Sequence, residues 1–132
     1  MNISFRFYVM VYENGDQVLS SFSHPNEFNS LGLILNTYPS ISELEWFKKL
    51  VIDARKKQEK SGNIGLNNLS VFVTGDITEI TTEFAGSLVQ KVPTDIVLEY
   101  IEECIKFHER YHSGSIPGLI PPKTLAKWNI RT

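Results

Sequence analysis

The chain has 132 residues, of which 42% are hydrophobic and 21% charged, and its formal net charge is −2. This length and composition are typical of a soluble globular protein, so we expect one domain spanning residues 1–132. The small negative charge does not favour nucleic acid as a partner, and no apolar run reaches the roughly 18 residues of a membrane span. The single cysteine, Cys104, excludes an internal disulfide and is typical of a reducing compartment, so we expect a cytoplasmic protein.

Residues 3–12 form a run rich in β-branched and aromatic residues, which predicts a β-strand. The Asn14-Gly15 pair that follows is favoured at tight turns, so we expect a hairpin with a returning strand at residues 17–22. Neither face of the first strand is strongly polar, which favours a central strand that is at least partly covered on both faces. Residues 23–39 combine turn chemistry with an interrupted apolar run, so they form either a short strand or an irregular buried segment.

Residues 40–60 carry apolar residues at helical spacing and predict the first long helix. Its start has two candidate capping boxes, in which a Ser and a Glu three residues later cap each other's backbone N–H groups. These pairs are Ser42 with Glu45, and Ser40 with Glu43. Basic residues near the end of the helix complement its C-terminal dipole, and Gly62 suits the C-cap region.

Three short strands separated by short turns follow this helix and predict an antiparallel meander. They lie at residues 68–74, 78–84 and 87–92. Pro93 ends the meander, and Thr94 or Asp95 is expected to cap a second long helix. The sequence therefore predicts an α+β fold with a mainly antiparallel sheet of about five strands, in ββαβββα order. Two long helices pack against this sheet, and an apolar Pro-rich C-terminal tail is expected to pack along the body.

The second long helix, within residues 93–114, has the strongest helical pattern in the chain. Its apolar face recurs at steps of three and four residues. This face comprises Val97, Tyr100, Ile101, Cys104, Ile105, His108 and Tyr111. Because Cys104 lies in the later half of an acidic helix, beside Glu102 and Glu103, we interpret it as a buried core cysteine and not as an activated thiol.

The last turn of this helix, residues 108–112, matches the H-E-x-x-H pattern of zinc peptidases. His108 and His112 would bind one zinc ion while Glu109 acts as the base. A third ligand is missing downstream, since residues 113–132 contain no His, Asp, Glu or Cys. Cys104 is about 12 Å from His112 by helical rise, too far to share a metal with both histidines. We therefore expect no metal or cofactor, and we interpret the two histidines as charges that are favourable at a helix C-terminus.

Acidic residues are concentrated in one part of the chain. Residues 76–109 contain eight acids against Lys91 and Lys106, whereas residues 110–132 contain four bases and no acid. These regions either neutralise each other in the fold or leave an acidic face for a cationic partner. The acidic residues either form an ordinary solvated surface or, in the functional interpretation, a docking site for a basic protein. The candidate partner-binding residues are Glu79, Glu83, Asp95, Glu99, Glu102 and Glu103.

The Arg6-bearing first strand, the acidic region at residues 79–103 and the Pro-rich apolar tail are the least generic parts of this build. With them, the chain resembles bacterial immunity proteins of contact-dependent inhibition and related toxin systems. The resemblance implies a cytosolic binder that blocks a cognate toxin, often a basic nuclease, by occupying its active site or substrate surface. Two alternatives stay open: a compact zinc-dependent hydrolase, and a structural or adaptor domain with an apolar interface, such as a homodimer through an exposed strand edge.

Overall fold

The computed structural model describes residues 3–24, 26–66, 68–82 and 89–116, and it confirms the α+β class. The expected turn at residues 85–86 and most of the apolar tail fall outside the described residues. The elements are β1 (Ser4–Val11), β2 (Gln17–His24), the 3₁₀ helix η1 (Asn26–Leu31), α1 (Gly32–Thr37), α2 (Ile41–Lys56), β3 (Leu69–Thr74), β4 (Ile77–Thr82), β5 (Val89–Pro93) and α3 (Thr94–His112).

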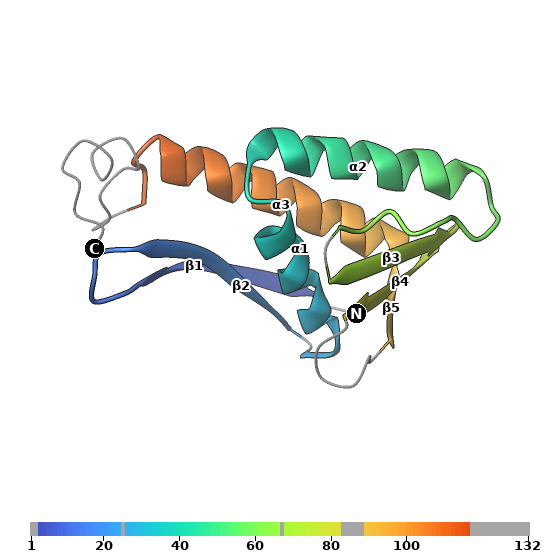
Figure 1. Ribbon diagram of the computed structural model, residues 1–132, viewed down its shortest axis with the longest axis horizontal. Helices are drawn as coiled ribbons and strands as arrows, with labels where there is room; N and C mark the ends of the chain where they lie inside the picture. Colours follow the sequence, from blue (N-terminus) through green and yellow to red (C-terminus); the bar gives the residue numbers. More distant parts are fainter. Residues whose placement is uncertain (1–2, 25, 67, 83–88, 117–132) are drawn as a thin grey trace.

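The described strands form two antiparallel sheets, and the expectation of one five-stranded sheet is wrong. One sheet is the β1–β2 hairpin, and the other is the β3–β4–β5 meander. The long helices α2 and α3 run side by side in opposite directions, and both sheets lie on one side of this pair (Figure 1). Strand β1 is therefore not a central strand, because β2 is its only neighbour among the described strands.

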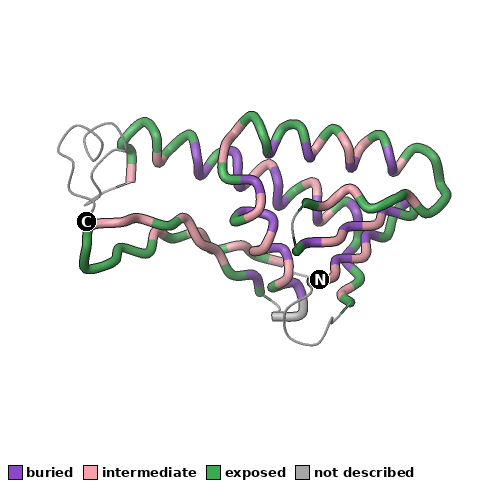
Figure 2. Tube along the Cα trace, in the orientation of Figure 1, coloured by how far each residue is buried: buried purple, intermediate pink, exposed green. Residues whose placement is uncertain are grey.

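The core lies where α2, α3, α1 and the meander meet, as the purple segments of Figure 2 show. The predicted apolar face of α3 is confirmed, with all its residues buried except the half-buried Tyr111. The rings of Tyr38 and Phe47 stack with their centroids 4.4 Å apart, which joins the end of α1 to α2. The chain before α2 is thus part of the core.

Residues 23–39 were expected to be a strand or an irregular segment, and both expectations are wrong, because this segment contains η1 and α1. Its buried residues follow the i, i+3, i+4, i+7 spacing of one helix face. From residue 31 onward they are Leu31, Ile34, Leu35 and Tyr38, and Phe28 of η1 is buried three residues earlier. Gly32, whose presence favoured a break, opens α1 close to the carbonyl oxygen of Ser21.

Ser40 caps α2, because its hydroxyl accepts a 3.2 Å hydrogen bond from the Glu43 N–H, and the same hydroxyl donates to the Glu43 carboxylate at 3.0 Å. The helix ends at Lys56, earlier than expected, and the chain turns at Gln58, whose φ of 63° is left-handed. Gly62 is therefore not the C-cap. Beyond this turn, the backbone N–H groups of Ser61 and Ile64 pair with the edge of β3.

The start of α3 also differs from the expectation that Thr94 or Asp95 caps it. Pro93 occupies the N-cap position, and no side chain caps the helix. The Thr94 hydroxyl donates a 2.9 Å hydrogen bond to the carbonyl of Gly75, and the Thr94 N–H donates to Asp76 at 2.7 Å. These bonds tie the helix start to the turn between β3 and β4.

Candidate binding surfaces

The residues of the predicted acidic site are divided between two elements. Asp95, Glu99, Glu102 and Glu103 lie on α3, where none of them is buried, whereas Glu79 lies in β4 of the meander. Glu83 falls outside the described residues. The α3 acids therefore line the side of the helix that faces away from the core, and Glu79 belongs to a separate part of the surface.

Basic residues pair with most of these acids. Arg55 of α2 contacts Asp95 at 2.5 Å and Asp76 at 2.8 Å, which raises the pKa of its guanidinium. The other pairs are Lys48 with Glu102, Lys106 with Glu103 at 3.4 Å, and Lys60 with Glu79 at 3.6 Å. The acidic region is thus partly neutralised, with α2 supplying the cations for Asp76, Asp95 and Glu102. Among the α3 acids of the predicted site, Glu99 is the exposed one without an ion pair in the described part of the chain.

The two histidines of the H-E-x-x-H motif lie in different environments. His108 is 1% exposed and neither of its ring nitrogens has a hydrogen-bond partner among the described residues, whereas His112 is exposed. Their rings stack with centroids 5.7 Å apart. Burial, and then the nearby His112, lower the pKa of His108, so the expectation of a favourable imidazolium at this position is wrong. Within the described ranges, no three His, Cys, Asp or Glu side chains converge to hold a metal ion.

Cys104 is buried, as the sequence indicated. Burial raises the pKa of its thiol to about 12, because a thiolate would lose its hydration there. The thiol is therefore protonated at neutral pH and serves as a small apolar core residue.

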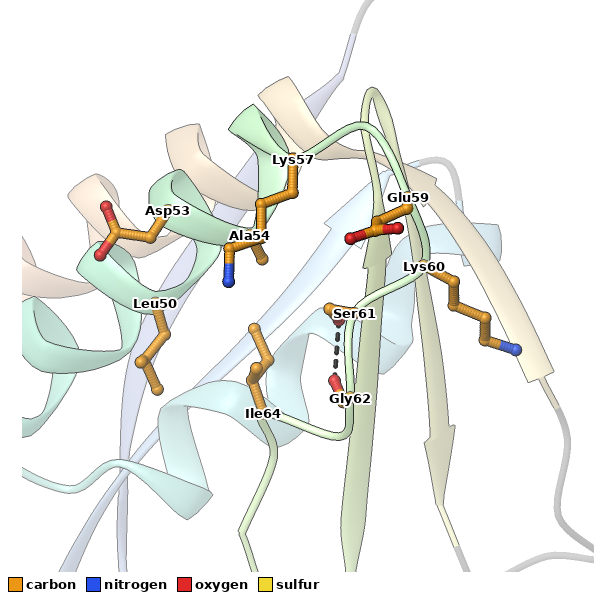
Figure 3. Close-up of a pocket in the computed structure, with 9 residues that line it drawn as sticks. All are labelled: Leu50, Asp53, Ala54, Lys57, Glu59, Lys60, Ser61, Gly62 and Ile64. Atoms are coloured by element: carbon orange, nitrogen blue, oxygen red, sulfur yellow. Dashed lines mark hydrogen bonds between the residues drawn. The ribbon is translucent and has the colours of Figure 1, made fainter.

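A groove of about 430 Å³ lies between α2 and residues 59–64 (Figure 3). Leu50, Ala54 and Ile64 give it an apolar floor, while Lys60 points away from it. Its other charged lining residues are Asp53, Lys57 and Glu59. Because these charges are of both signs and do not converge on one point, the groove selects no class of ligand.

The outer face of the hairpin is the surface that sequence reasoning missed. The structure exposes four large apolar side chains there: Tyr8 (43%), Met10 (42%), Val18 (38%) and Phe22 (47%). The register sets Met10 opposite Val18 and Arg6 opposite Phe22, and the rings of Tyr8 and Phe22 are 6.1 Å apart. We call these five residues the outer face. The apolar alternate residues of β1 were the available signal, but they were assigned to a covered strand.

The opposite side of the same hairpin packs on α3. The ring of Phe5 meets the ring of Tyr100 edge-on, with the ring centroids 5.2 Å apart, and the ring centroids of Phe7 and Phe107 are also 5.2 Å apart. The hydroxyls of Ser21 and Tyr100 are 2.5 Å apart. These contacts fix the hairpin on the helix and leave the outer face directed away from it.

Comparisons with protein-family models, curated proteins and solved structures find no match to this chain. None of the helices in the described part of the chain is long and apolar enough to cross a membrane.

Proposed function

We propose that this chain is a protein-binding domain and that the outer face of the hairpin is its main contact surface. The observation that carries this proposal is the exposure, on one small sheet, of adjacent apolar side chains around Arg6. Six of the ten large exposed hydrophobic residues in the described part of the chain lie between residues 8 and 22, so the exposure is concentrated there. Contiguous apolar patches mark interaction sites, and aromatic residues and Arg dominate the binding energy of interfaces.

The chemistry of the outer face defines the partner surface that fits it. Tyr8 and Phe22 offer rings for apolar packing, and Arg6 offers a guanidinium that pairs with a carboxylate. No described residue forms an ion pair with Arg6. The fitting partner therefore presents an apolar surface with an acidic group at one end, opposite Arg6.

The finer proposal is that the domain is an immunity protein that neutralises a cognate bacterial toxin. The resemblance stated for the sequence supports it, and so does the exposed side of α3, where Glu99 has no cationic neighbour in the described ion pairs. If the toxin is basic, this side of α3 supplies a second, electrostatic contact that mainly raises the association rate.

The experiment is capture of the partner from cells that produce the chain, followed by affinity measurements on the purified pair. Tyr8→Ser together with Phe22→Ser is expected to weaken binding by at least about tenfold, because the two neighbouring rings are the aromatic side chains of the patch. Leu66→Ser is the matched control, since Leu66 is 40% exposed outside the hairpin. Equal affinities for the double variant and the control would show that the outer face is not the contact surface.

The toxin-neutralising role needs its own readout. Expression of the captured partner alone is expected to arrest growth, and co-expression of this chain is expected to relieve the arrest. Glu99→Lys is expected to slow association with a basic partner by a few-fold, and added salt should reduce the difference. A partner without toxicity would remove the immunity proposal and leave the protein-binding proposal in place.

A further inference from the structure

The hydrogen-bond alternation of the hairpin shows which backbone groups point away from it. In an antiparallel pair, alternate residues bond to the neighbouring strand and the others direct their N–H and C=O groups outward. The Tyr12 N–H donates to the Asp16 carbonyl at 2.8 Å, so the even-numbered residues of β1 bond to β2. The odd-numbered residues therefore point their backbone groups toward the other edge of β1. They are Phe5, Phe7, Val9 and Val11.

The second half of the outward edge of β2 is covered by the helices that follow it. The Ser23 N–H donates a 2.9 Å hydrogen bond to the Asn29 side chain of η1. Gly32 of α1 lies so close to the Ser21 carbonyl oxygen that a Cβ there would be 3.5 Å from it. These two elements therefore cover the outward edge of β2 at Ser21 and Ser23.

The outward edge of β3 is also closed, by the extended residues 61–64. Two backbone N–H groups of this segment donate to β3, and two of its side chains accept from β3. These bonds are Ser61 N to Val73 O at 2.8 Å, Ile64 N to Val71 O at 2.9 Å, Val73 N to Ser61 Oγ at 2.8 Å, and Val71 N to Asn63 Oδ1 at 2.9 Å. The outward edge of β1 has no such cover among the described residues.

We propose that two copies of this chain associate by antiparallel pairing of their β1 strands at this open edge, so that the two hairpins form one four-stranded sheet. A long open edge is a template for strand addition, and proteins that avoid it use Pro, bulges or charged residues there. Strand β1 has eight residues, no Pro or Gly, and one charged residue, Arg6. An antiparallel pair of identical strands also satisfies twofold symmetry, which most homodimers have.

The charge pattern of β1 fits a second copy. The odd-numbered residues carry the outward-pointing backbone groups, so an odd residue of one β1 strand must pair with an odd residue of the other. Two such registers, the centred registers, overlap nearly the whole length of the two strands. One sets Arg6 opposite Tyr8 of the second copy, which favours a cation–π contact. The other sets Arg6 opposite Met10 and Tyr8 opposite Tyr8. Neither register places like charges opposite each other, whereas the register that opposes the two Arg6 side chains pairs only residues 4–8.

This association uses the edge of the hairpin, and the proposed partner surface uses its outer face, so either can exist without the other. In the dimer the two outer faces lie next to each other in one sheet. Pairing of two eight-residue strands alone buries less than the ~800 Å² per partner of a standard interface. The dimer is therefore expected to be weak, with a dissociation constant in roughly the micromolar to millimolar range.

The test is sedimentation velocity of the purified chain from about 1 μM to about 1 mM, with two substitutions at one position. Val9→Pro removes an N–H that points to the open edge without removing a hydrogen bond to β2, and it is expected to raise the dimer dissociation constant at least about tenfold. Val9→Ala keeps that N–H and should dimerise to within a few-fold of the unsubstituted chain. Tyr8→Arg places arginines opposite each other in either centred register, so it should also weaken the dimer if Val9→Pro does not fold.

Amide hydrogen exchange at the two ends of this concentration range completes the test. In the dilute sample the amides of Phe7 and Val9 should exchange faster than those of Tyr8 and Met10, and this difference should shrink in the concentrated sample. A chain that stays monomeric throughout would overturn the proposal. So would a dimer that neither Val9→Pro nor Tyr8→Arg weakens, or edge amides that are already protected in the monomer.

Discussion

The two sheets of this protein lie along the same helix but differ in how they are covered. In the meander, Val71, Val73 and Ile80 are almost wholly buried, and residues 61–64 close the edge of β3. In the hairpin, one side packs on α3 while the outer face and the β1 edge are left uncovered by the described residues. The meander is thus part of the buried core, whereas the hairpin exposes apolar side chains and a strand edge.

Truncation of one apolar side chain in each sheet should have very different effects on the free energy of unfolding. Ile80→Ala in β4 should lower the free energy of unfolding by about 2–5 kcal/mol, because Ile80 is 1% exposed and the variant leaves a cavity. Met10→Ala on the outer face should lower the free energy of unfolding by only about 0.5 kcal/mol or less. Urea unfolding measures both values. Similar costs at the two positions would mean that the outer face is covered in solution.

A smaller effect is expected from opening the closed edge. Asn63→Ala removes the side-chain oxygen that accepts from the N–H groups of Val71 and Gly65. Because the Val71 N–H then lacks its partner, the cost should be about 1–3 kcal/mol. Asn68→Ala, at an exposed position beside β3, is the matched control and should leave stability unchanged within about 0.5 kcal/mol. If the two variants unfold at the same urea concentration, the edge bonds do not contribute to stability.

The closed edge also shows where the sequence was insufficient. The strands and the buried face of α3 follow from local patterns and were predicted, and the Ser40 cap was one of the two candidates for the start of α2. The division into two sheets was not, because it depends on residues 61–64 taking the place of a strand beside β3. Their side chains replace backbone groups in that pairing, and a polar Ser-Gly-Asn segment gives no strand pattern that would reveal it.

The sequence predicted which residues of the candidate acidic site are exposed on their own helix or strand. It did not predict which residues of other elements lie next to them. The acids of α3 are exposed as a helical stripe requires, but their pairing with Lys48 and Arg55 depends on how α2 packs. The outer face was missed because an alternating apolar strand is compatible with cover on both sides. These residues are exposed because no further described sheet packs on this side of the hairpin. That is a feature of the tertiary structure, which the strand pattern does not reveal.

The helix that both sheets share gives a prediction about pH. Burial lowers the pKa of His108 in the folded chain below its ordinary value of 6.5. At a pH between the folded-state pKa and 6.5, the unfolded chain therefore binds the proton more readily than the folded chain does. The contribution of the neutral His108 is therefore fully present above about pH 6.5, and it falls as the pH falls until the folded-state pKa is reached. The free energy of unfolding should decrease between about pH 7.5 and about pH 5.5, and His108→Leu should decrease less.

The matched control for this measurement is His24→Leu, since His24 is exposed at the end of β2. This variant should keep the pH dependence of the unsubstituted chain. An identical pH dependence in the chain and in His108→Leu would show that His108 does not carry the effect, and that its ring is not held neutral by burial.

The smallest effect separates the two faces of the hairpin within a single strand. The Ser21 hydroxyl meets the Tyr100 hydroxyl at 2.5 Å on the inner side, while Ser20 lies opposite Tyr8 on the outer side. Ser21→Ala leaves the buried Tyr100 hydroxyl without this partner and should cost about 1 kcal/mol, measured by urea unfolding. Ser20→Ala, one residue away, should cost less than about 0.5 kcal/mol. Because the two substitutions are chemically identical, a larger cost at Ser20 would mean that the side of the hairpin assigned to the solvent is the one held by the fold.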